Sequence, residues 1–144
     1  LEWGKVLHFG THNAGRLALH ICKTMLTEML ANEQAGFKKI KDLGLKLTKE
    51  IQEVTRKNNK HKVICQGVNS MFQIFFTDQE KISDYRDFCR SVDRIKFRDF
   101  SLKLFDKGIY MNPSATLHSL SAVVHNEEDI RVTAKAISET LDEL

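Results

Sequence analysis

The chain has 144 residues, of which 42% are hydrophobic and 28% charged, and its formal net charge is +3. These values are typical of a single folded domain with a substantial core, and they exclude a disordered chain. The charge is mild and the lysines are spread among acidic residues, which argues against a nucleic-acid partner. No apolar run approaches the roughly 20 residues that cross a bilayer, so we expect no membrane partner.

The three cysteines, Cys22, Cys65 and Cys89, lie far apart and form no Cys-x-x-Cys pair. A sparse, odd set of this kind is typical of free thiols in a reducing compartment. The six histidines have no metal-ligand spacing to carboxylates or cysteines. We therefore expect a cytoplasmic protein without a metal site.

The first half of the chain predicts two amphipathic helices and then two strands. Apolar residues recur at helical spacing over residues 17–30 and again over 37–54. The runs 62–68 and 71–76 are short, apolar and rich in β-branched and aromatic residues, which favours strands. The polar residues 77–84 that follow predict a loop.

The second half predicts two longer helices among shorter elements. One helix covers residues 97–105 and ends near Gly108, a natural left-handed cap. The last helix begins after Asn126, a good N-cap, with acidic residues in its first turn. The shorter elements expected here are a helical piece at 85–92, a strand at 109–111, a loop at 112–118 and a strand at 119–124.

The order of these elements predicts the fold class. Strands that lie close together in the sequence favour a small, mostly antiparallel sheet. Several amphipathic helices can then pack on one face of that sheet. We expect an α+β fold in one domain.

The strongest local signal for ligand binding precedes the first helix, in the stretch HFGTHNAGRLALH. The backbone N–H groups and hydroxyl of Gly10 and Thr11, backed by a helix N-terminus, can hold an anion. The spacing is neither that of a Walker motif nor G-x-G-x-x-G. From the residues alone, the chain is an α+β domain with one candidate anion site and no complete catalytic group.

Four stretches occur in the order GTHNAGRLA, GVNSMFQIFFTD, FDKGIYMNPS and VVHNEEDI. Together they resemble the C-terminal part of class III pyridoxal-phosphate-dependent aminotransferases of fold type I, nearest to the glutamate-1-semialdehyde aminomutase branch. The resemblance covers nearly the whole chain. It implies that residues 1–144 are the C-terminal domain of such an enzyme, with residues 1–35 as an interface segment and linking helix.

The resemblance also implies a cofactor and partners. The cofactor is pyridoxal 5'-phosphate, and the substrates are a small-molecule amino donor and a carbonyl acceptor. Gly10 and Thr11 match the family's Gly-Thr pair, which contacts the cofactor phosphate of the neighbouring subunit, so a homodimer is implied. In the family the lysine that carries the cofactor precedes this pair, and Lys5 is too close to match it.

The chain also begins with Leu1 rather than Met. We therefore expect the full-length parent to be an aminotransferase or aminomutase, and the 144-residue chain alone to lack the lysine, to have no catalytic residue of its own and to be inactive.

The resemblance places His118 on the substrate side, near a position where some relatives have an arginine. Leu117 stands where the aminomutase branch has a glutamate, which leaves the choice between mutase and transaminase open. A different interpretation is also open, in which the chain is a non-catalytic α+β interaction or dimerisation module that shares descent with the enzymes. The coding sequence upstream of Leu1 discriminates between the two interpretations, because only the enzyme requires a large lysine-containing domain there.

Overall fold

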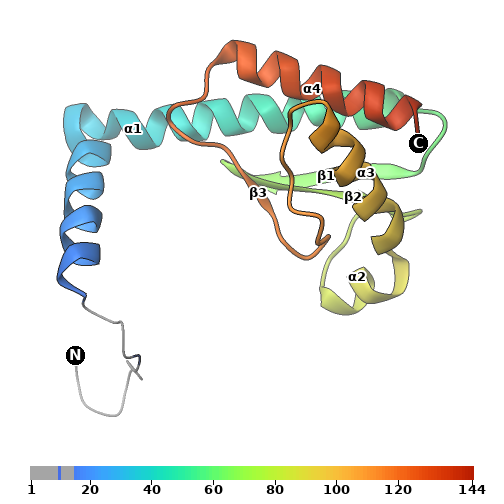
Figure 1. Cartoon of the computed structure of the whole chain (residues 1–144), viewed down its shortest axis with the longest axis horizontal. Helices are drawn as coiled ribbons and strands as arrows, with labels where there is room; N and C mark the ends of the chain where they lie inside the picture. The colour runs from blue at the N-terminus through green and yellow to red at the C-terminus, as the bar shows by residue number, and fades with distance from the viewer. Residues whose placement is uncertain (1–9, 11–14) are drawn as a thin grey trace. The chain divides into compact units, whose positions relative to one another are not determined.

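The computed structural model describes Gly10 and residues 15–144. The chain divides into two compact units, Leu1–Phe37 and Lys38–Leu144 (Figure 1). Helix α1 (Arg16–Lys57) contributes its first part to one unit and its second part to the other.

In the first unit, α1 is interrupted at residues 31–34. Asn32, Glu33 and Gln34 have φ angles of 49°, 57° and 64°. Left-handed backbone is costly for residues with a Cβ atom and does not continue a right-handed helix. The predicted boundary between two amphipathic helices is therefore confirmed, at the position where the first apolar pattern ends.

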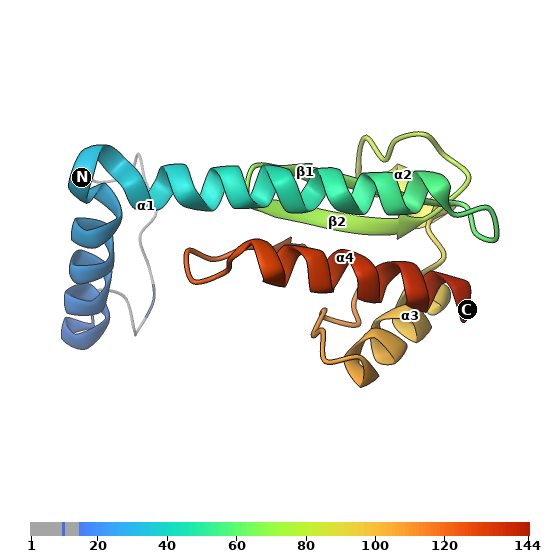
Figure 2. The ribbon, with the colours of Figure 1, turned by 90° about the horizontal axis from the view of Figure 1, so that it is seen from above.

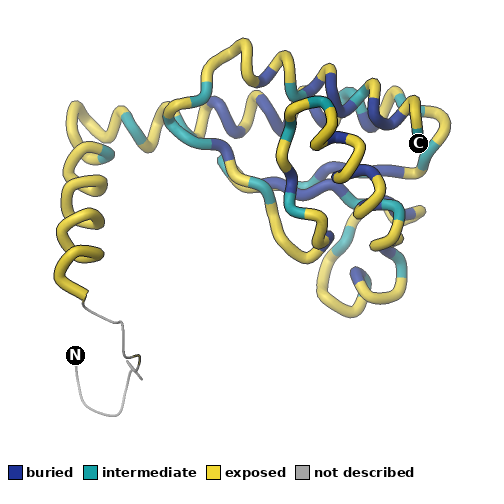
Figure 3. Tube along the Cα trace, viewed as in Figure 1, coloured by how far each residue is buried: buried dark blue, intermediate teal, exposed yellow. Residues whose placement is uncertain are grey.

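The apolar stripe of the first helical segment is exposed in the chain (Figure 3). Only Met29 and Gly36 are partly buried among residues 15–37, and the Met29 side chain packs where a Cβ of Gly36 would lie. The exposed large apolar side chains of this segment are Leu17, Leu19, Ile21, Met25, Leu26 and Leu30.

The second unit contains a three-stranded antiparallel sheet in the order β1-β2-β3. Strands β1 (Val63–Val68) and β2 (Met71–Phe76) form a hairpin in which Val68 pairs with Met71. Strand β3 (Ser119–Leu120) pairs with the start of β2. Both predicted strands of the hairpin are confirmed, and so is the α+β class with an antiparallel sheet.

One face of the sheet carries the core. Phe72, Ile74 and Phe76 of β2 are buried on this face, where alternate residues of a strand must lie together. The second part of α1 and helix α4 (Glu127–Asp142) run side by side in the same direction across it (Figure 2). Helix α3 (Arg94–Asp106) also packs here, because the rings of Phe76 and Phe100 lie edge to face at 5.5 Å.

The largest fully buried side chains of the core come from all of these elements. They are Ile51, Ile74, Phe97, Phe100, Leu104, Ile137 and Leu141. The short helix α2 (Tyr85–Ser91) packs on the other face of the sheet. Its Phe88 contacts Phe75, which points to that face of β2, with the ring centroids 6.1 Å apart. The three longer helices thus cover one face, as the pattern predicts.

The prediction of a strand at 109–111 is wrong, and the strand predicted at 119–124 is shorter than expected. The backbone N–H of Ile109 donates to the carbonyl of Leu104 and closes the end of α3, so it is not free to enter a sheet ladder. Gly108 has a φ of 82°, as expected for a left-handed cap. Within the predicted strand at 119–124, only Ser119 and Leu120 pair with β2.

Helix α4 starts at the predicted cap. The Asn126 side chain accepts hydrogen bonds from the backbone N–H groups of Glu128 and Asp129, and the Asp129 carboxylate accepts from the backbone N–H of Asn126. This reciprocal capping box satisfies donors that a helix start leaves free.

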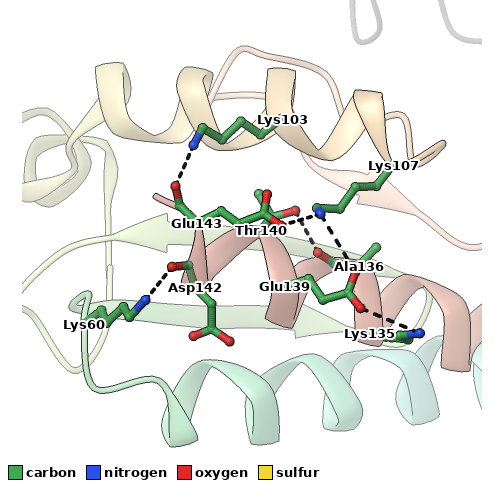
Figure 4. A network of polar contacts seen from close by, with 9 residues as sticks. All are labelled: Lys60, Lys103, Lys107, Lys135, Ala136, Glu139, Thr140, Asp142 and Glu143. Atoms are coloured by element: carbon green, nitrogen blue, oxygen red, sulfur yellow. Dashed lines mark hydrogen bonds and ion pairs between the residues drawn. The ribbon is translucent and has the colours of Figure 1, made fainter.

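The end of α4 has no basic residue in its own last turn. Lysines from other elements lie there instead (Figure 4). Lys60 donates to the carbonyl of Asp142, and Lys103 donates to that of Glu143 at 2.6 Å. A hydrogen bond from Lys107 holds the pKa of the Glu143 carboxyl below its usual value. Cations at a helix C-terminus complement its dipole, and these three fasten α4 to α3 and to the end of α1.

Candidate functional site

Of the predicted phosphate-binding pair, only Gly10 is a described residue, and Thr11 lies outside the described residues. Gly10 is exposed and has a φ of 152°, a conformation that L side chains rarely adopt. A glycine at such a position leaves the backbone N–H open to close approach by a ligand. The first turn of α1, which begins six residues later, has no acidic residue to oppose an anion. Gly10 thus offers a donor of the kind that a phosphate accepts from, while residues 11–14, which join it to this turn, lie outside the described residues.

His118 is exposed and lies in the irregular segment between α3 and β3. It lines an open pocket of about 680 Å³ beside β1 and β2. Gly10 and His118 belong to different units of the chain.

Two glutamines on neighbouring strands form the polar part of this pocket. Gln66 of β1 and Gln73 of β2 are direct partners in the antiparallel ladder. They lie on the sheet face opposite the core, since Gln73 alternates with the buried Phe72 and Ile74. We therefore call this the outer face of the sheet.

Each glutamine tethers a different irregular segment to the outer face. Gln66 binds the backbone of Ile82 twice: its Nε2 donates to the carbonyl at 3.2 Å, and its Oε1 accepts from the N–H at 2.7 Å. Gln73 Nε2 donates to the carbonyl of Ala115 at 3.0 Å. Neither glutamine was among the predicted site residues, although a polar amide inside an otherwise apolar strand is a signal that could have found them.

A second pocket, of about 250 Å³, lies between β2, α4 and residues 108–111. Two of its polar lining residues are already engaged: His125 Nδ1 accepts from the backbone of Ala122, and Asp129 belongs to the capping box. These groups have structural roles and are weaker candidates for ligand binding.

Two titratable groups are shielded from solvent: the ring nitrogens of His61, which lies outside the outer-face pocket, and Cys65, which is among the residues that border it. Both ring nitrogens of His61 are shielded from solvent, and neither makes a hydrogen bond of ordinary geometry to a described residue. Burial, and then the charges of Lys96 and Lys60, lower the pKa of His61, while the backbone of Leu141 opposes the shift. Burial raises the pKa of the Cys65 thiol to about 12. Neither shift is that of an activated nucleophile or base at neutral pH.

Within Gly10 and residues 15–144, no cluster of three or more histidine, cysteine, aspartate or glutamate side chains could hold a metal ion. In the same part of the chain, no helix is both long and apolar enough to span a membrane.

Comparison with known proteins finds curated relatives named glutamate-1-semialdehyde 2,1-aminomutase. The chain is 32% identical over 139 residues to a glutamate-1-semialdehyde 2,1-aminomutase of Thermus thermophilus, which covers 96% of this chain and 31% of the relative. The chain thus spans about a third of the length of the curated relatives that it matches. No family model matches it.

Solved structures share the fold. A glutamate-1-semialdehyde aminomutase from Pseudomonas aeruginosa, solved in complex with PMP, matches with a TM-score of 0.78 and 13% identity, over 100% of this chain and 32% of that one. A β-phenylalanine aminotransferase from Variovorax paradoxus matches with a TM-score of 0.77 and 20% identity, over 97% of this chain and 31% of that one. The resemblance to aminomutases and aminotransferases is confirmed, and the shares covered are consistent with a C-terminal portion.

Proposed function

We propose that this chain is the C-terminal domain of a pyridoxal-phosphate-dependent aminotransferase or aminomutase. The observation that carries the proposal is the match to aminomutases over 96% of this chain but only 31% of the relative. The parent would act in the cytoplasm and move an amino group between an amino compound and a carbonyl compound. When bound, the cofactor supplies an electron sink for chemistry at the carbon that bears the amino group.

Gly10 and Thr11 would bind the cofactor phosphate in the neighbouring subunit. The exposed Gly10 N–H and the Thr11 hydroxyl are donors of the kind that a phosphate accepts from. Their task is binding and orientation. The proposal requires a homodimer, because the phosphate belongs to the other subunit's site.

The exposed apolar stripe of the first helical segment supports this assembly. Ile21, Met25 and Leu26 are each about half exposed or more in the isolated chain. Contiguous exposed apolar surface of this kind marks an interface. We propose that the stripe is covered in the parent dimer.

His118 would line the substrate side of the site. Its ring makes no hydrogen bond to another described residue and borders the outer-face pocket. Unlike an arginine, histidine cannot fork a carboxylate with two parallel donors. It can orient a substrate through one ring nitrogen.

The proposal predicts that the 144-residue chain is inactive alone and lacks a cofactor-binding lysine. We would titrate the purified chain with pyridoxal phosphate, follow absorbance near about 420 nm, and locate any lysine adduct by borohydride trapping and mass mapping. The absence of a specific adduct agrees with a detached domain. A saturable adduct at one lysine, or transamination by the chain itself, contradicts it.

A second test addresses the phosphate contact. In a ¹⁵N-labelled chain, inorganic phosphate should shift the backbone amides of Gly10 and Thr11 selectively. Thr11→Val should weaken this response, while Thr27→Val, at an exposed helical position, should not. An equal response in both variants would argue against the proposed role of Thr11.

A further inference from the structure

The ring of His61 borders the core beside Phe76, close to the end of α4. Its centroid lies 6.3 Å from that of Phe76, edge to face. Both ring nitrogens are shielded from solvent, and neither makes a hydrogen bond of ordinary geometry to a described residue. A neutral imidazole can occupy such a site, whereas the charged form would bury a charge and two N–H donors that need acceptors. Protonation of this ring must therefore move something.

The backbone that carries the ring is held in place. The side-chain oxygen of Asn58 accepts hydrogen bonds from the backbone N–H groups of Lys60 and His61, at 3.2 and 2.9 Å. The backbone N–H of Asn58 donates to the carbonyl of Val54, which joins this turn to the end of α1. Because the turn is fixed in this way, a charged ring has to be accommodated by the side chain itself or by the elements packed on it.

The charged groups around the ring oppose a further positive charge. Burial, and then the charges of Lys96 on α3 and Lys60 in the turn, lower the pKa of His61, and the backbone of Leu141 in α4 raises it. No carboxylate of the described residues raises this pKa, so a protonated ring has no counter-ion among them. The carboxylates of the neighbouring elements are engaged elsewhere or exposed: Asp78 after β2 pairs with Lys62, Asp93 caps α3, Glu143 of α4 binds Lys107, and Asp99 of α3 and Asp142 of α4 are exposed.

The last turn of α4 packs against the ring. Leu141 is fully buried, and its backbone is close enough to act on the ring. The two carbonyls that follow it accept hydrogen bonds from Lys60 and Lys103, which are exposed (Figure 4). Lysines keep their charge between about pH 5 and 8. Among the described groups at this contact, His61 is therefore the one whose charge changes in that range.

We propose that His61 is a pH-sensitive latch for residues 141–144: the neutral ring packs against the last turn of α4, and the protonated ring releases it. Release lets the charged ring reach water, where the charge of Lys96 is screened. The last turn yields first, because no further turn of helix supports it and its carbonyls are held by exposed lysine side chains. The core keeps its own contacts, since Phe76 and Phe100 still pack on each other. This inference does not rest on the proposed function, because it concerns the folded domain alone.

Amide hydrogen exchange of the ¹⁵N-labelled chain tests the latch. Exchange rates at pH 7.5 and 5.5, with and without about 1 M urea, are divided by those of an unstructured chain to give protection factors. We expect the protection factors of residues 141–144 to fall several-fold, at most about tenfold, from pH 7.5 to 5.5, because a released histidine titrates near its ordinary pKa of about 6.5. They should be lower than those of the β1–β2 hairpin and nearly independent of urea, since a local opening exposes little surface.

Variants assign the effect to the ring and its neighbours. His61→Phe keeps a ring against Phe76 and removes the titration, so the protection of residues 141–144 should no longer depend on pH. Lys96→Gln removes a repelling cation, which raises the pKa of the folded ring toward its ordinary value, and the pH effect should shrink. His20→Gln and Lys49→Gln are the matched controls, because both residues are exposed on α1, and the pH effect should be unchanged in them.

Three results would overturn the inference: protection factors of residues 141–144 that do not change with pH, factors equal to those of the hairpin with the same urea dependence, or a pH effect that persists in His61→Phe. The Cε1 proton resonance of His61 follows the titration of the ring itself. A ring that titrates while residues 141–144 keep their protection swings into solvent alone, which also contradicts the latch. If His61→Phe does not fold, an unchanged pH effect in Lys96→Gln counts against the inference instead.

Discussion

Gly44 lies in the second part of α1, where the helix touches the turn between β1 and β2. A Cβ atom at this position would lie 2.4 Å from the carbonyl oxygen of Asn69 and 2.5 Å from Cα of Ser70. Ordinary contacts between such atoms are roughly 3.5 Å or more. Gly44→Ala must therefore push the turn and the helix apart by about 1 Å, and both groups in the way are backbone.

The expected magnitude is the difference between two effects. Alanine favours a helix interior over glycine by about 0.8–1.0 kcal/mol. Overpacking of a close contact costs about 1–3 kcal/mol, and the upper part of that range applies where no flexible side chain can move aside. Asn69 already has a φ of 53°, so the turn has little freedom to adjust. We expect a net loss of about 1–2 kcal/mol in the free energy of unfolding.

Thermal unfolding followed by circular dichroism measures this effect. For a unit of this size, the expected loss lowers Tm by roughly 4–16 °C. Gly108→Ala is the comparison, because Gly108 has a φ of 82° but no atom within 4 Å of the added Cβ, so its cost of about 1 kcal/mol arises from the backbone alone. A Tm for Gly44→Ala equal to or above that of the unsubstituted chain would refute the steric argument.

Three further outcomes can be measured on the same chain. Phe100→Ala empties the fully buried centre of the core and should cost about 3–5 kcal/mol in urea unfolding, whereas Phe105→Ala, at a 61% exposed position, should cost less than about 1 kcal/mol. Burial lowers the pKa of His61 in the folded state below the usual 6.5, so the unfolded chain takes up the proton first and stability is lost as the pH falls below that value. His61→Phe should flatten the dependence of the urea midpoint between pH 8 and pH 5, and an unchanged slope would contradict this assignment. Because burial raises the pKa of Cys65 to about 12, a thiol reagent at pH 8 should modify the two exposed cysteines and spare Cys65 until the chain is unfolded.

The pairing of Gln66 with Gln73 could have been predicted from the sequence by working out the register of the hairpin. The two runs 62–68 and 71–76 are separated only by residues 69 and 70, and a hairpin closed by a two-residue turn places Gln66 opposite Gln73. Two polar amides on the same face of an apolar hairpin were thus within reach of pattern reasoning. Their partners were not, because Ala115 lies 42 residues from Gln73 in the chain and no local pattern joins them.

Features that depend on near neighbours in the chain were predictable from the pattern of residues. Helical and strand periodicity located α1, the hairpin and α4, and the preference of Asn126 for a cap located the start of the last helix. Which distant side chains and segments meet could be read only from the folded chain. His61 is shielded beside the ring of Phe76 and the backbone of Leu141 in α4, and the segment around Ala115 is held at the outer face by Gln73, 42 residues away in the chain. Such outcomes depend on which distant groups compete for the same donors and the same space, and that competition exists only once the chain has folded.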